Sequence, residues 1–278
     1  MILVTGAAGQ LGTAFGKQLP EARLVTRSDL DLAKPGAVGK FLDATRPDLL
    51  INCAAYTAVD AAESDEETAA MVNSAAVETM AAWCGSNSAR FVTFSTDYVF
   101  SGDAVGAYVE SSVPDPRSAY GRTKLAGERA ALAVNPDSLV IRTSWVVSGT
   151  HPNFVATMLK RVATQELRVV DDQRGCPTVT DDLAAGTLAA IDAGAAGILH
   201  LTNQGVTTWF ELARHAVSLA GHDPLRVSPC STDEYPRPAP RPANSELASE
   251  RLTELGLGPL PNWRESLPAV INALLASS

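Results

Sequence analysis

The sequence predicts an α/β fold, a doubly wound parallel sheet with a smaller C-terminal lobe. Two observations support this prediction. Short apolar runs alternate with helical stretches through the first half of the chain, which is the pattern of parallel strands joined by crossover helices. The first run, Ile2–Val4, leads directly into the glycine-rich segment Gly6-Ala7-Ala8-Gly9-Gln10-Leu11-Gly12, which is typical of a turn from a strand into a helix.

The expected elements follow from this alternation. Strands are expected at Ile2–Thr5, Arg23–Thr26, Leu49–Asn52, Arg90–Ser95, Leu139–Arg142, Leu167–Val170 and Ile198–Leu201. Helices are expected at Leu11–Leu19, Pro35–Thr45, Glu67–Trp83, Ala119–Val134, Thr180–Ala193, Thr208–Leu219 and Trp263–Leu275. We expect Pro268 to kink or restart the last helix, and residues 229–242 to form an irregular loop.

Composition and charge narrow the class of protein. With 278 residues, 46% hydrophobic and 19% charged, the chain can bury a large core. A net charge of −9 argues against a nucleic-acid partner, because no basic stripe is available to neutralise phosphates. No apolar run reaches membrane-spanning length, and the N-terminus lacks a signal-peptide pattern, so we expect a cytoplasmic protein that binds no membrane. The four cysteines and four histidines show no metal-ligand spacing, and no metal centre is expected.

The glycine-rich segment is suited to a dinucleotide. Its glycines let the backbone turn tightly and approach a pyrophosphate, and the following helix offers its N-terminal N–H groups to the anion. The spacing is Gly-x-x-Gly-x-x-Gly rather than the commoner Gly-x-Gly-x-x-Gly, so an ordinary strand-to-helix turn is the alternative. The position at the start of a strand–helix–strand pattern favours cofactor binding.

A second motif that points to catalysis is the pair of Tyr120 and Lys124. They lie four residues apart, which places them on one face of a helix. A phenol titrates at about pH 10 in water. We expect the nearby ammonium to stabilise phenolate and lower the pKa of Tyr120, so that the tyrosine becomes a general acid or base.

Further chemistry-bearing segments follow the predicted strands, where ligands bind in a doubly wound sheet. These segments are Asn52–Thr57, Phe94–Phe100 and Arg142–Trp145. Thr96 could hydrogen-bond a substrate carbonyl while Tyr120 supplies its proton, and Lys124 could reach a nicotinamide ribose. Together these residues outline a site for carbonyl reduction.

Taken together, these motifs resemble those of a known family. The glycine turn, the Ser95-Thr96 hydroxyl pair and Tyr-x-x-x-Lys are similar to those of the extended short-chain dehydrogenase/reductase superfamily. Within it, several longer segments resemble the dTDP-4-dehydrorhamnose reductase family, nearly from end to end. These segments are Gly9–Gly12, Asn52–Asp60, Ser95–Phe100, Tyr120–Glu128, Arg142–Val146, Asp172–Thr178 and Arg241–Ser245.

The resemblance implies a Rossmann-type fold and a division into domains. Residues 1–148 would form the NAD(P)-binding Rossmann domain, to which the chain would return around residues 179–203. Residues 149–178 and 204–278 would form a substrate-binding lobe. The implied activity is that of an NAD(P)H-dependent oxidoreductase acting on the C4 keto group of a dTDP-4-keto-6-deoxysugar, first dTDP-4-dehydro-L-rhamnose, which would become dTDP-L-rhamnose.

Carried over to this chain, the family makes Thr96, Tyr120 and Lys124 the catalytic set. Tyr120 would protonate the C4 oxygen as hydride arrives from the nicotinamide, and Thr96 would hold the carbonyl. The cofactor-binding residues would be Gly6, Gly9, Gln10, Leu11, Gly12, Arg27, Asp31, Leu32, Ala54, Ala55 and Tyr56, together with Tyr120 and Lys124. The substrate-binding residues would be Thr96, Asp97, Tyr98, Trp145 and Arg241.

Three of these assignments have a structural alternative. Arg241, whose guanidinium matches diphosphate oxygens, could be a solvated loop residue. Trp145 could belong to the core, as large aromatics often do. Asp97 could cap the local turn instead of bordering the sugar.

The chain departs from the family at two positions. Ala14 stands where some members carry a glutamate that binds Mg²⁺ between subunits, so we expect a monomer or weak homodimer without that magnesium bridge. Val147 replaces a tyrosine, which affects the identity of the sugar more than the reaction.

The sequence leaves alternatives open for both the cofactor and the activity. Arg27 favours NADPH because it can meet a 2′-phosphate, although Asp29 and Asp31 follow closely and NADH stays an alternative. The chain could instead reduce a different dTDP-4-keto-deoxysugar in natural-product biosynthesis. A non-catalytic, nucleotide-binding regulatory subunit is the third hypothesis, and the presence of Thr96, Tyr120 and Lys124 together argues against it.

Overall fold

Six parallel strands form the central sheet of the structure, a computed structural model that describes residues 1–34 and 36–276. Their order is β10-β5-β4-β3-β1-β2, and each neighbouring pair is parallel. The strands are β1 (Ile2–Thr5), β2 (Arg23–Val25), β3 (Leu49–Asn52), β4 (Arg90–Thr96), β5 (Leu139–Thr143) and β10 (Gly197–His200). The α/β doubly wound fold predicted from the sequence is confirmed.

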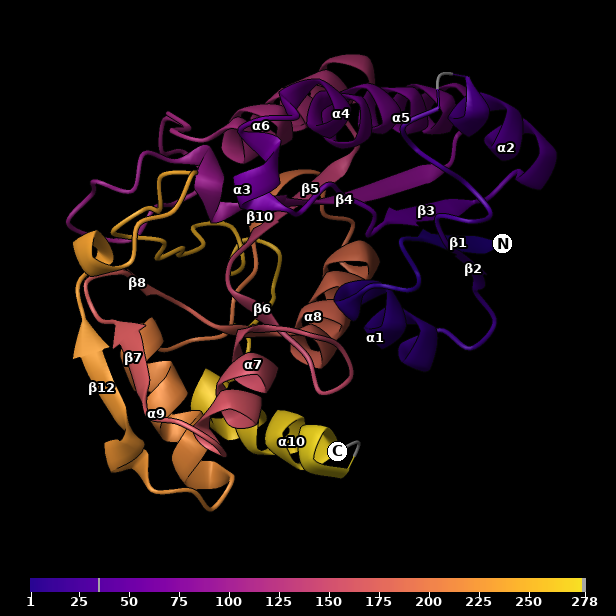
Figure 1. Ribbon diagram of the computed structural model, residues 1–278. Coiled ribbons are helices and arrows are strands. Elements are labelled where there is room, and N and C mark those ends of the chain that lie inside the picture. Colours follow the sequence, from indigo (N-terminus) through magenta and orange to yellow (C-terminus); the bar gives the residue numbers. More distant parts are fainter. Residues whose placement is uncertain (35, 277–278) are drawn as a thin grey trace.

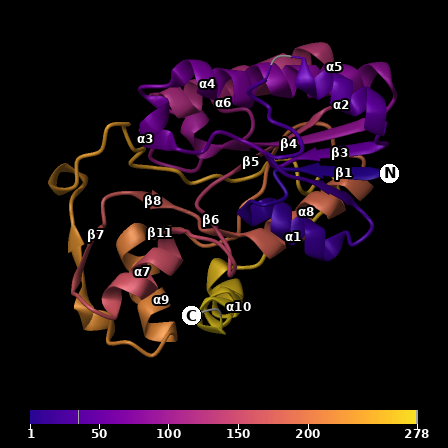
Figure 2. The same ribbon diagram turned by 45° about the vertical axis from the view of Figure 1, so that its right-hand side comes forward.

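Helices cover both faces of the sheet (Figure 1). On one face lie α2 (Ala37–Thr45), α4 (Glu66–Ala70), α5 (Ala76–Ser86) and α6 (Ala119–Val134), with the short α3 (Val59–Ala62) nearby. On the other face, α1 (Gln10–Gln18) packs against α8 (Thr180–Asp192) (Figure 2). Strand order reverses between β1 and β3, and a crevice for ligands is expected at the carboxyl ends of these strands.

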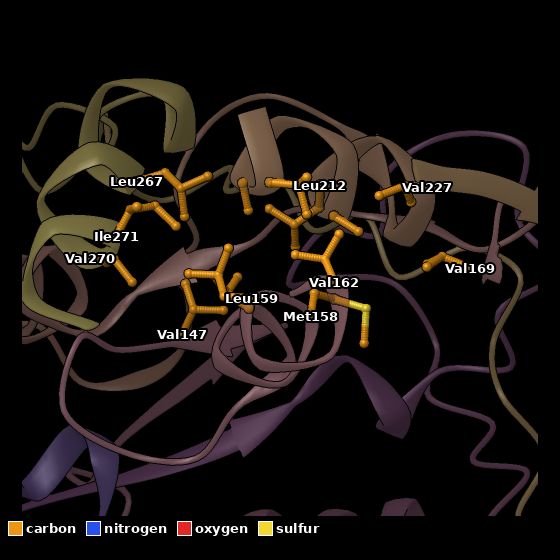
Figure 3. Close-up of a cluster of buried hydrophobic side chains, with 14 of the residues drawn as sticks. Val147, Met158, Leu159, Val162, Val169, Leu212, Val227, Leu267, Val270 and Ile271 are labelled. Carbon is orange, nitrogen blue, oxygen red and sulfur yellow. The ribbon is translucent and has the colours of Figure 1, made fainter. Parts of the chain in front are cut away.

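A second hydrophobic core lies outside the sheet, in what we call the C-terminal lobe. This lobe comprises β6 (Val146–Val147), α7 (Phe154–Val162), β7 (Leu167–Val170), α9 (Trp209–Leu219), β12 (Val227–Cys230) and α10 (Trp263–Ala276). Side chains such as Val162, Leu212 and Ile271 meet between the three helices (Figure 3). Two short strand pairs complete the lobe: β6 with β9 (Thr178–Val179), and β8 (Arg174–Gly175) with β11 (Thr207–Thr208).

The predicted strands all occur, each with ends shifted by at most one residue. The predicted helix Glu67–Trp83 is divided, because a π-helical turn over Met71–Ala75 separates α4 from α5. Pro268 does not restart the last helix, and α10 continues through it, with Leu267 and Val270 buried on either side. The expected loop 229–242 begins inside β12 and contains a 3₁₀ turn. Of the predicted helix Pro35–Thr45, residue 35 lies outside the described residues, and α2 occupies the rest from Ala37.

Close packing fixes α6 against the end of β4. An ideal Cβ on Gly121 would lie 2.1 Å from the carbonyl oxygen of Tyr98, in the 3₁₀ turn Asp97–Val99 that follows β4. Ser118 caps the helix, since its Oγ accepts a hydrogen bond from the Gly121 N–H at 3.1 Å. The helix therefore approaches the strand end as closely as a backbone without a side chain allows.

Gly121→Ala should destabilise the folded protein by about 2–3 kcal/mol, because the new methyl group has to displace backbone rather than a flexible side chain. Gly39→Ala in α2 is the matched control, since a Cβ there meets nothing within 4 Å. The control should gain about 0.5–1 kcal/mol from lower unfolded-chain entropy. Urea unfolding followed by tryptophan fluorescence measures both, and equal stability of the two variants would contradict the prediction.

Candidate functional site

A cavity of about 910 Å³ lies at the carboxyl ends of the strands, where the strand order reverses. Residues in the last part of, or just after, each of β1 to β5 contribute to its wall. The predicted cofactor residues that line it are Gly6, Gly9, Gln10, Leu11, Arg27, Asp31, Leu32, Ala54, Ala55, Tyr56, Tyr120 and Lys124. Gly12 is the exception: it is buried beneath the turn, where a Cβ would lie 2.3 Å from the Gly6 carbonyl oxygen.

The glycine turn forms a cradle of backbone at one side of the cavity. Gly6 has φ +67°, and a Cβ there would lie 2.5 Å from the nitrogen of Ala54, so only glycine fits between β1 and the segment after β3. Gly9 begins α1 without a side-chain cap, and the first turn carries no acidic residue. The N-terminal N–H groups of α1 can therefore serve an anion in the cavity.

Asn73, in the π-helical turn, fixes the segment after β3. Its Oδ1 accepts from the Tyr56 N–H at 2.8 Å, and its Nδ2 donates to the Tyr56 carbonyl at 3.1 Å and to Thr123 Oγ1 at 3.2 Å. Asn73 is almost fully buried. One side chain thus ties the cavity wall at Tyr56 to helix α6.

Tyr120 lies in the first turn of α6 and faces the cavity, but its pKa shifts in the direction opposite to the one expected. Burial raises the pKa of the phenol, the charge of Asp97 raises it further, and a hydrogen bond with the Thr96 side chain lowers it. Lys124 instead donates a hydrogen bond from Nζ to the Phe94 carbonyl at 2.6 Å. The expectation that Lys124 lowers this pKa is therefore wrong, and Tyr120 stays protonated at neutral pH.

Lys124 is buried one helical turn further along α6. Burial lowers the pKa of its ammonium to about 8, against the opposing influence of Glu128. Glu128 forms two hydrogen bonds with Arg142 of β5, with Nε and Nη2 of the guanidinium at 2.9 Å and 2.7 Å. Both partners are buried, and the Arg142 guanidinium lies 5.0 Å from the ring centroid of Phe100. This pair anchors the helix face that carries Tyr120 and Lys124.

Thr96, Asp97 and Tyr98 form a connected polar patch beside Tyr120. Thr96 Oγ1 donates to Asp97 Oδ1 at 2.9 Å and accepts from the Tyr98 N–H at 3.2 Å, so Thr96 rather than Asp97 caps the turn. Burial raises the pKa of Asp97 to about 6, while hydrogen bonds from Ser245 and Thr96 lower it. Tyr98 meets Tyr120 edge to face, with ring centroids 5.6 Å apart. Tyr120 joins this patch to the cavity.

Arg241 lies beyond the patch, next to Tyr98. Its Nη2 is 2.9 Å from Asp60 Oδ1, and the same guanidinium donates to the Ala239 carbonyl. Burial raises the pKa of Tyr98, and the charge of Arg241 opposes that shift. The structure therefore brings Arg241 near the patch, held by Asp60.

Trp145 belongs to the C-terminal lobe rather than to the cavity wall. Its backbone has φ +47°, and its ring stacks on that of Trp209 with centroids 3.6 Å apart. Phe154 also packs against Trp209, with ring centroids 4.6 Å apart. Both tryptophans are half-buried and pack against the hydrophobic core of the C-terminal lobe, as the core alternative for Trp145 expected.

The cavity wall also contains side chains that received no role from the sequence. Ser95 and Thr143 end neighbouring strands, and their hydroxyl oxygens are buried without a hydrogen-bond partner among the described residues. Their position at strand ends was the signal that could have identified them. Buried hydroxyls left to a ligand, next to a glycine cradle, fit a polar dinucleotide. His151 lines the same cavity.

Other features bear on metal and membrane binding. Within residues 1–34 and 36–276, no group of three or more His, Cys, Asp and Glu side chains is arranged to hold a metal ion. No helix in that part of the chain is long and apolar enough to cross a bilayer. Ala14 is buried against the sheet, and the four cysteines are free thiols, three of them buried.

Asp97→Asn should stabilise the folded protein at pH 7.5. Burial raises the pKa of Asp97 from the ordinary 3.8 to about 6 in the folded state, so the folded protein carries an unfavourable buried charge above pH 6. A neutral amide removes that charge and should add about 1–3 kcal/mol at pH 7.5. The gain should shrink toward pH 4, where the folded carboxyl is already protonated. Urea unfolding at both pH values measures it, and a variant that is relatively less stable at pH 7.5 would contradict the expectation.

Known proteins resemble this chain along its whole length. The family model described as RmlD substrate binding domain matches residues 1–276. A Streptomyces antibioticus protein named probable dTDP-4,6-dihydroxy-2-methyloxan-3-one 4-ketoreductase is 44% identical, covering 99% of this chain and 96% of its own. A dTDP-4-dehydrorhamnose reductase from Clostridium acetobutylicum has a crystal structure with a TM-score of 0.94, 40% identity and 99% coverage of both chains. The Bacillus anthracis dTDP-4-dehydrorhamnose reductase, solved in complex with NADP, has a TM-score of 0.92 and 33% identity, covering 100% of this chain and 99% of its own. The chain belongs to the dTDP-4-dehydrorhamnose reductase family.

Proposed function

We propose that the protein is an NADPH-dependent reductase of the C4 keto group of a dTDP-4-keto-6-deoxysugar. The first candidate substrate is dTDP-4-dehydro-L-rhamnose, with dTDP-L-rhamnose as product. One observation carries the proposal: Tyr120 lines the cavity of the glycine turn and also contacts the patch of Thr96 and Tyr98. A protonated phenol between a nucleotide-sized cavity and a hydroxyl patch suits carbonyl reduction. The names of the relatives support the same reaction.

The lining of the cavity supports NADPH as the cofactor, which would supply the hydride. The glycine cradle at Gly6 would receive the diphosphate, and the strand-end residues Ala54, Ala55 and Tyr56 would flank the rest of the dinucleotide. Arg27 lines the far end of the cavity, where its guanidinium would meet a 2′-phosphate. Its Nε lies 3.6 Å from Asp31 Oδ1, and because the arginine is exposed a phosphate can replace the aspartate as its partner. Comparing kcat/KM for NADPH and NADH tests this preference.

The proton chemistry is assigned to three side chains. Burial keeps the Tyr120 phenol protonated, so Tyr120 can give its proton to the C4 oxygen. Thr96 would orient the carbonyl by turning to it the hydroxyl hydrogen that now goes to Asp97, while the Tyr98 N–H keeps the Thr96 oxygen in place. Lys124, held at the Phe94 carbonyl, would bind the nicotinamide ribose and keep a positive charge beside the reacting groups.

Contacts to the sugar nucleotide are part of the same proposal. Asp97 and Tyr98 would border the sugar, next to Tyr120. Trp145, which is half-buried, would contact the sugar nucleotide, and Arg241, while paired with Asp60, would contact its diphosphate. We also propose that the protein acts in the cytoplasm, as expected from the sequence.

Tyr120→Phe should lower kcat by a factor of about 100 to 10,000, because it removes the proton donor. The Kd of NADPH should stay close to the wild-type value, since the ring remains in the cavity wall. Tyr235→Phe is the matched control, because Tyr235 is exposed and is not among the residues that line the cavity. NADPH oxidation with dTDP-4-dehydro-L-rhamnose and fluorescence titration with NADPH measure the two quantities. Full activity of Tyr120→Phe would overturn the general-acid assignment.

The rate should also fall as pH rises above about 8. Burial lowers the pKa of Lys124 to about 8, so the ammonium is present below that pH and is lost above it. The Tyr120 phenol, whose pKa is raised, stays protonated through the same range. Lys124→Arg keeps its charge, so its basic limb should move to higher pH even if its rate is lower. A wild-type kcat/KM that stays flat to about pH 10 would contradict this role.

A second candidate function is the reduction of a different dTDP-4-keto-deoxysugar. The 44% identical relative bears the name of such a ketoreductase. Val147, where the family usually has tyrosine, is buried in the core of the C-terminal lobe and offers no polar group to a sugar. Turnover of a further-deoxygenated dTDP-4-keto-sugar, without turnover of dTDP-4-dehydro-L-rhamnose, would favour this candidate. Cofactor binding without turnover of either would favour a regulatory subunit.

For the assembly we propose a monomer or weak homodimer without a magnesium bridge. Ala14, at the position of the bridging glutamate, has no ligand atom and is buried. Light scattering with and without Mg²⁺ tests this, and magnesium-dependent dimerisation would refute it.

A further inference from the structure

The loop between β6 and α7 places a histidine on the glycine turn. His151 Nε2 lies 3.0 Å from the carbonyl oxygen of Ala8, and its Nδ1 lies 2.9 Å from Thr150 Oγ1. A carbonyl oxygen only accepts hydrogen bonds, so Nε2 carries the hydrogen and donates it to Ala8. In a neutral ring Nδ1 then accepts from the Thr150 hydroxyl, which sets the tautomer.

The loop that carries His151 is braced on the C-terminal lobe. Asn153 Nδ2 donates to the carbonyls of Ser148 and His151, at 2.7 Å and 2.9 Å, while Asn153 Oδ1 caps α7. A Cβ on Gly149 would lie 2.6 Å from Cβ of Ala273 in α10, so the loop lies tightly on that helix. His151 is thus a fixed group of the C-terminal lobe that reaches the nucleotide side of the protein.

The position of His151 relative to the other cationic side chains suggests its ligand. His151 lines the same cavity as the glycine turn. Among the described cavity-lining residues, the other side chains of the Lys, Arg and His class are Arg27, after β2, and Lys124, on α6. In the proposed complex, Arg27 would meet the adenosine 2′-phosphate and Lys124 the nicotinamide ribose. His151, through its contact with Ala8, lies beside the N-terminus of α1, where the diphosphate of a dinucleotide has to pass.

We propose that His151 is a cofactor-positioning residue that binds the diphosphate from the C-terminal lobe. Its Nε2–H, which here donates to Ala8, would donate to a diphosphate oxygen at the glycine turn. The C-terminal lobe then contributes to cofactor binding, and the cofactor holds the two lobes together. This inference rests on the proposed use of NADPH, but it concerns a residue outside the motifs of the glycine turn and the Tyr–Lys pair.

Direct binding measurements on the full chain test the role without an activity assay. His151→Leu should raise the Kd of NADPH roughly tenfold, the loss expected when a hydrogen bond to a charged oxygen is removed. His151→Gln keeps an N–H donor at the end of its side chain and should recover most of the affinity. His222→Leu is the matched control, because His222 lies after α9 and is not part of the cavity wall, and it should bind like wild type. NADPH fluorescence titration gives the constants.

Adenosine 2′-monophosphate separates a diphosphate contact from a general deformation of the cavity. It occupies the adenosine side and has no diphosphate, so its Kd, measured by competition with NADPH, should be equal for wild type and His151→Leu. Equal loss for both ligands, or equal NADPH affinity of wild type and His151→Leu, would overturn the inference. A wild-type protein that binds neither NADPH nor NADH would instead overturn the proposed function, so the two failures are distinct. Thermal unfolding of each variant shows that any loss is measured on folded protein.

Discussion

The position of α6 against the ends of β4 and β5 is the constraint on which the site depends. Three contacts of different kinds set it: the closest approach at Gly121, the Lys124 hydrogen bond to the Phe94 carbonyl, and the buried pair of Glu128 and Arg142. They are spaced along the same helix, so together they fix the distance of α6 from the sheet, its rotation about its own axis and its position along the strands. A buried ion pair is a weak source of stability but loses much when one partner is removed. The pair of Glu128 and Arg142 therefore contributes mainly by fixing the position of α6 along β5.

Burial sets the proton chemistry of the site more than neighbouring charges do. It is the largest influence on the pKa values of Tyr120, Lys124 and Asp97, raising the first and third and lowering the second. Each group is moved toward its neutral form, which leaves a protonated phenol and a lysine that titrates close to physiological pH. When Asp97 or Lys124 is charged, its burial lowers the free energy of unfolding. In the reaction proposed above, stability and function therefore oppose one another at Asp97 and Lys124.

The sequence predicted the elements whose pattern is local. The strands of the sheet, the glycine turn and the spacing of Tyr120 and Lys124 are each visible within a few residues of chain. What it missed depends on contacts between distant segments. The stack of Trp145 on Trp209 and the placement of His151 on Ala8 join residues far apart in sequence. The pKa of Tyr120 was predicted with the wrong sign, because sequence spacing shows the neighbouring ammonium but not the depth of burial.

Asn73 has a mechanical consequence for the site. The side-chain amide of Asn73 hydrogen-bonds both backbone groups of Tyr56 and the hydroxyl of Thr123. One side chain thus connects the segment after β3, which would receive the cofactor, with α6, which carries Tyr120. Asn73 lies in the π-helical turn between α4 and α5, a kind of turn that is frequent at functional sites. The segment after β3 and α6 therefore cannot move apart without breaking hydrogen bonds of one buried side chain. In the proposed reaction, this link would hold the cofactor and the proton donor at a constant separation.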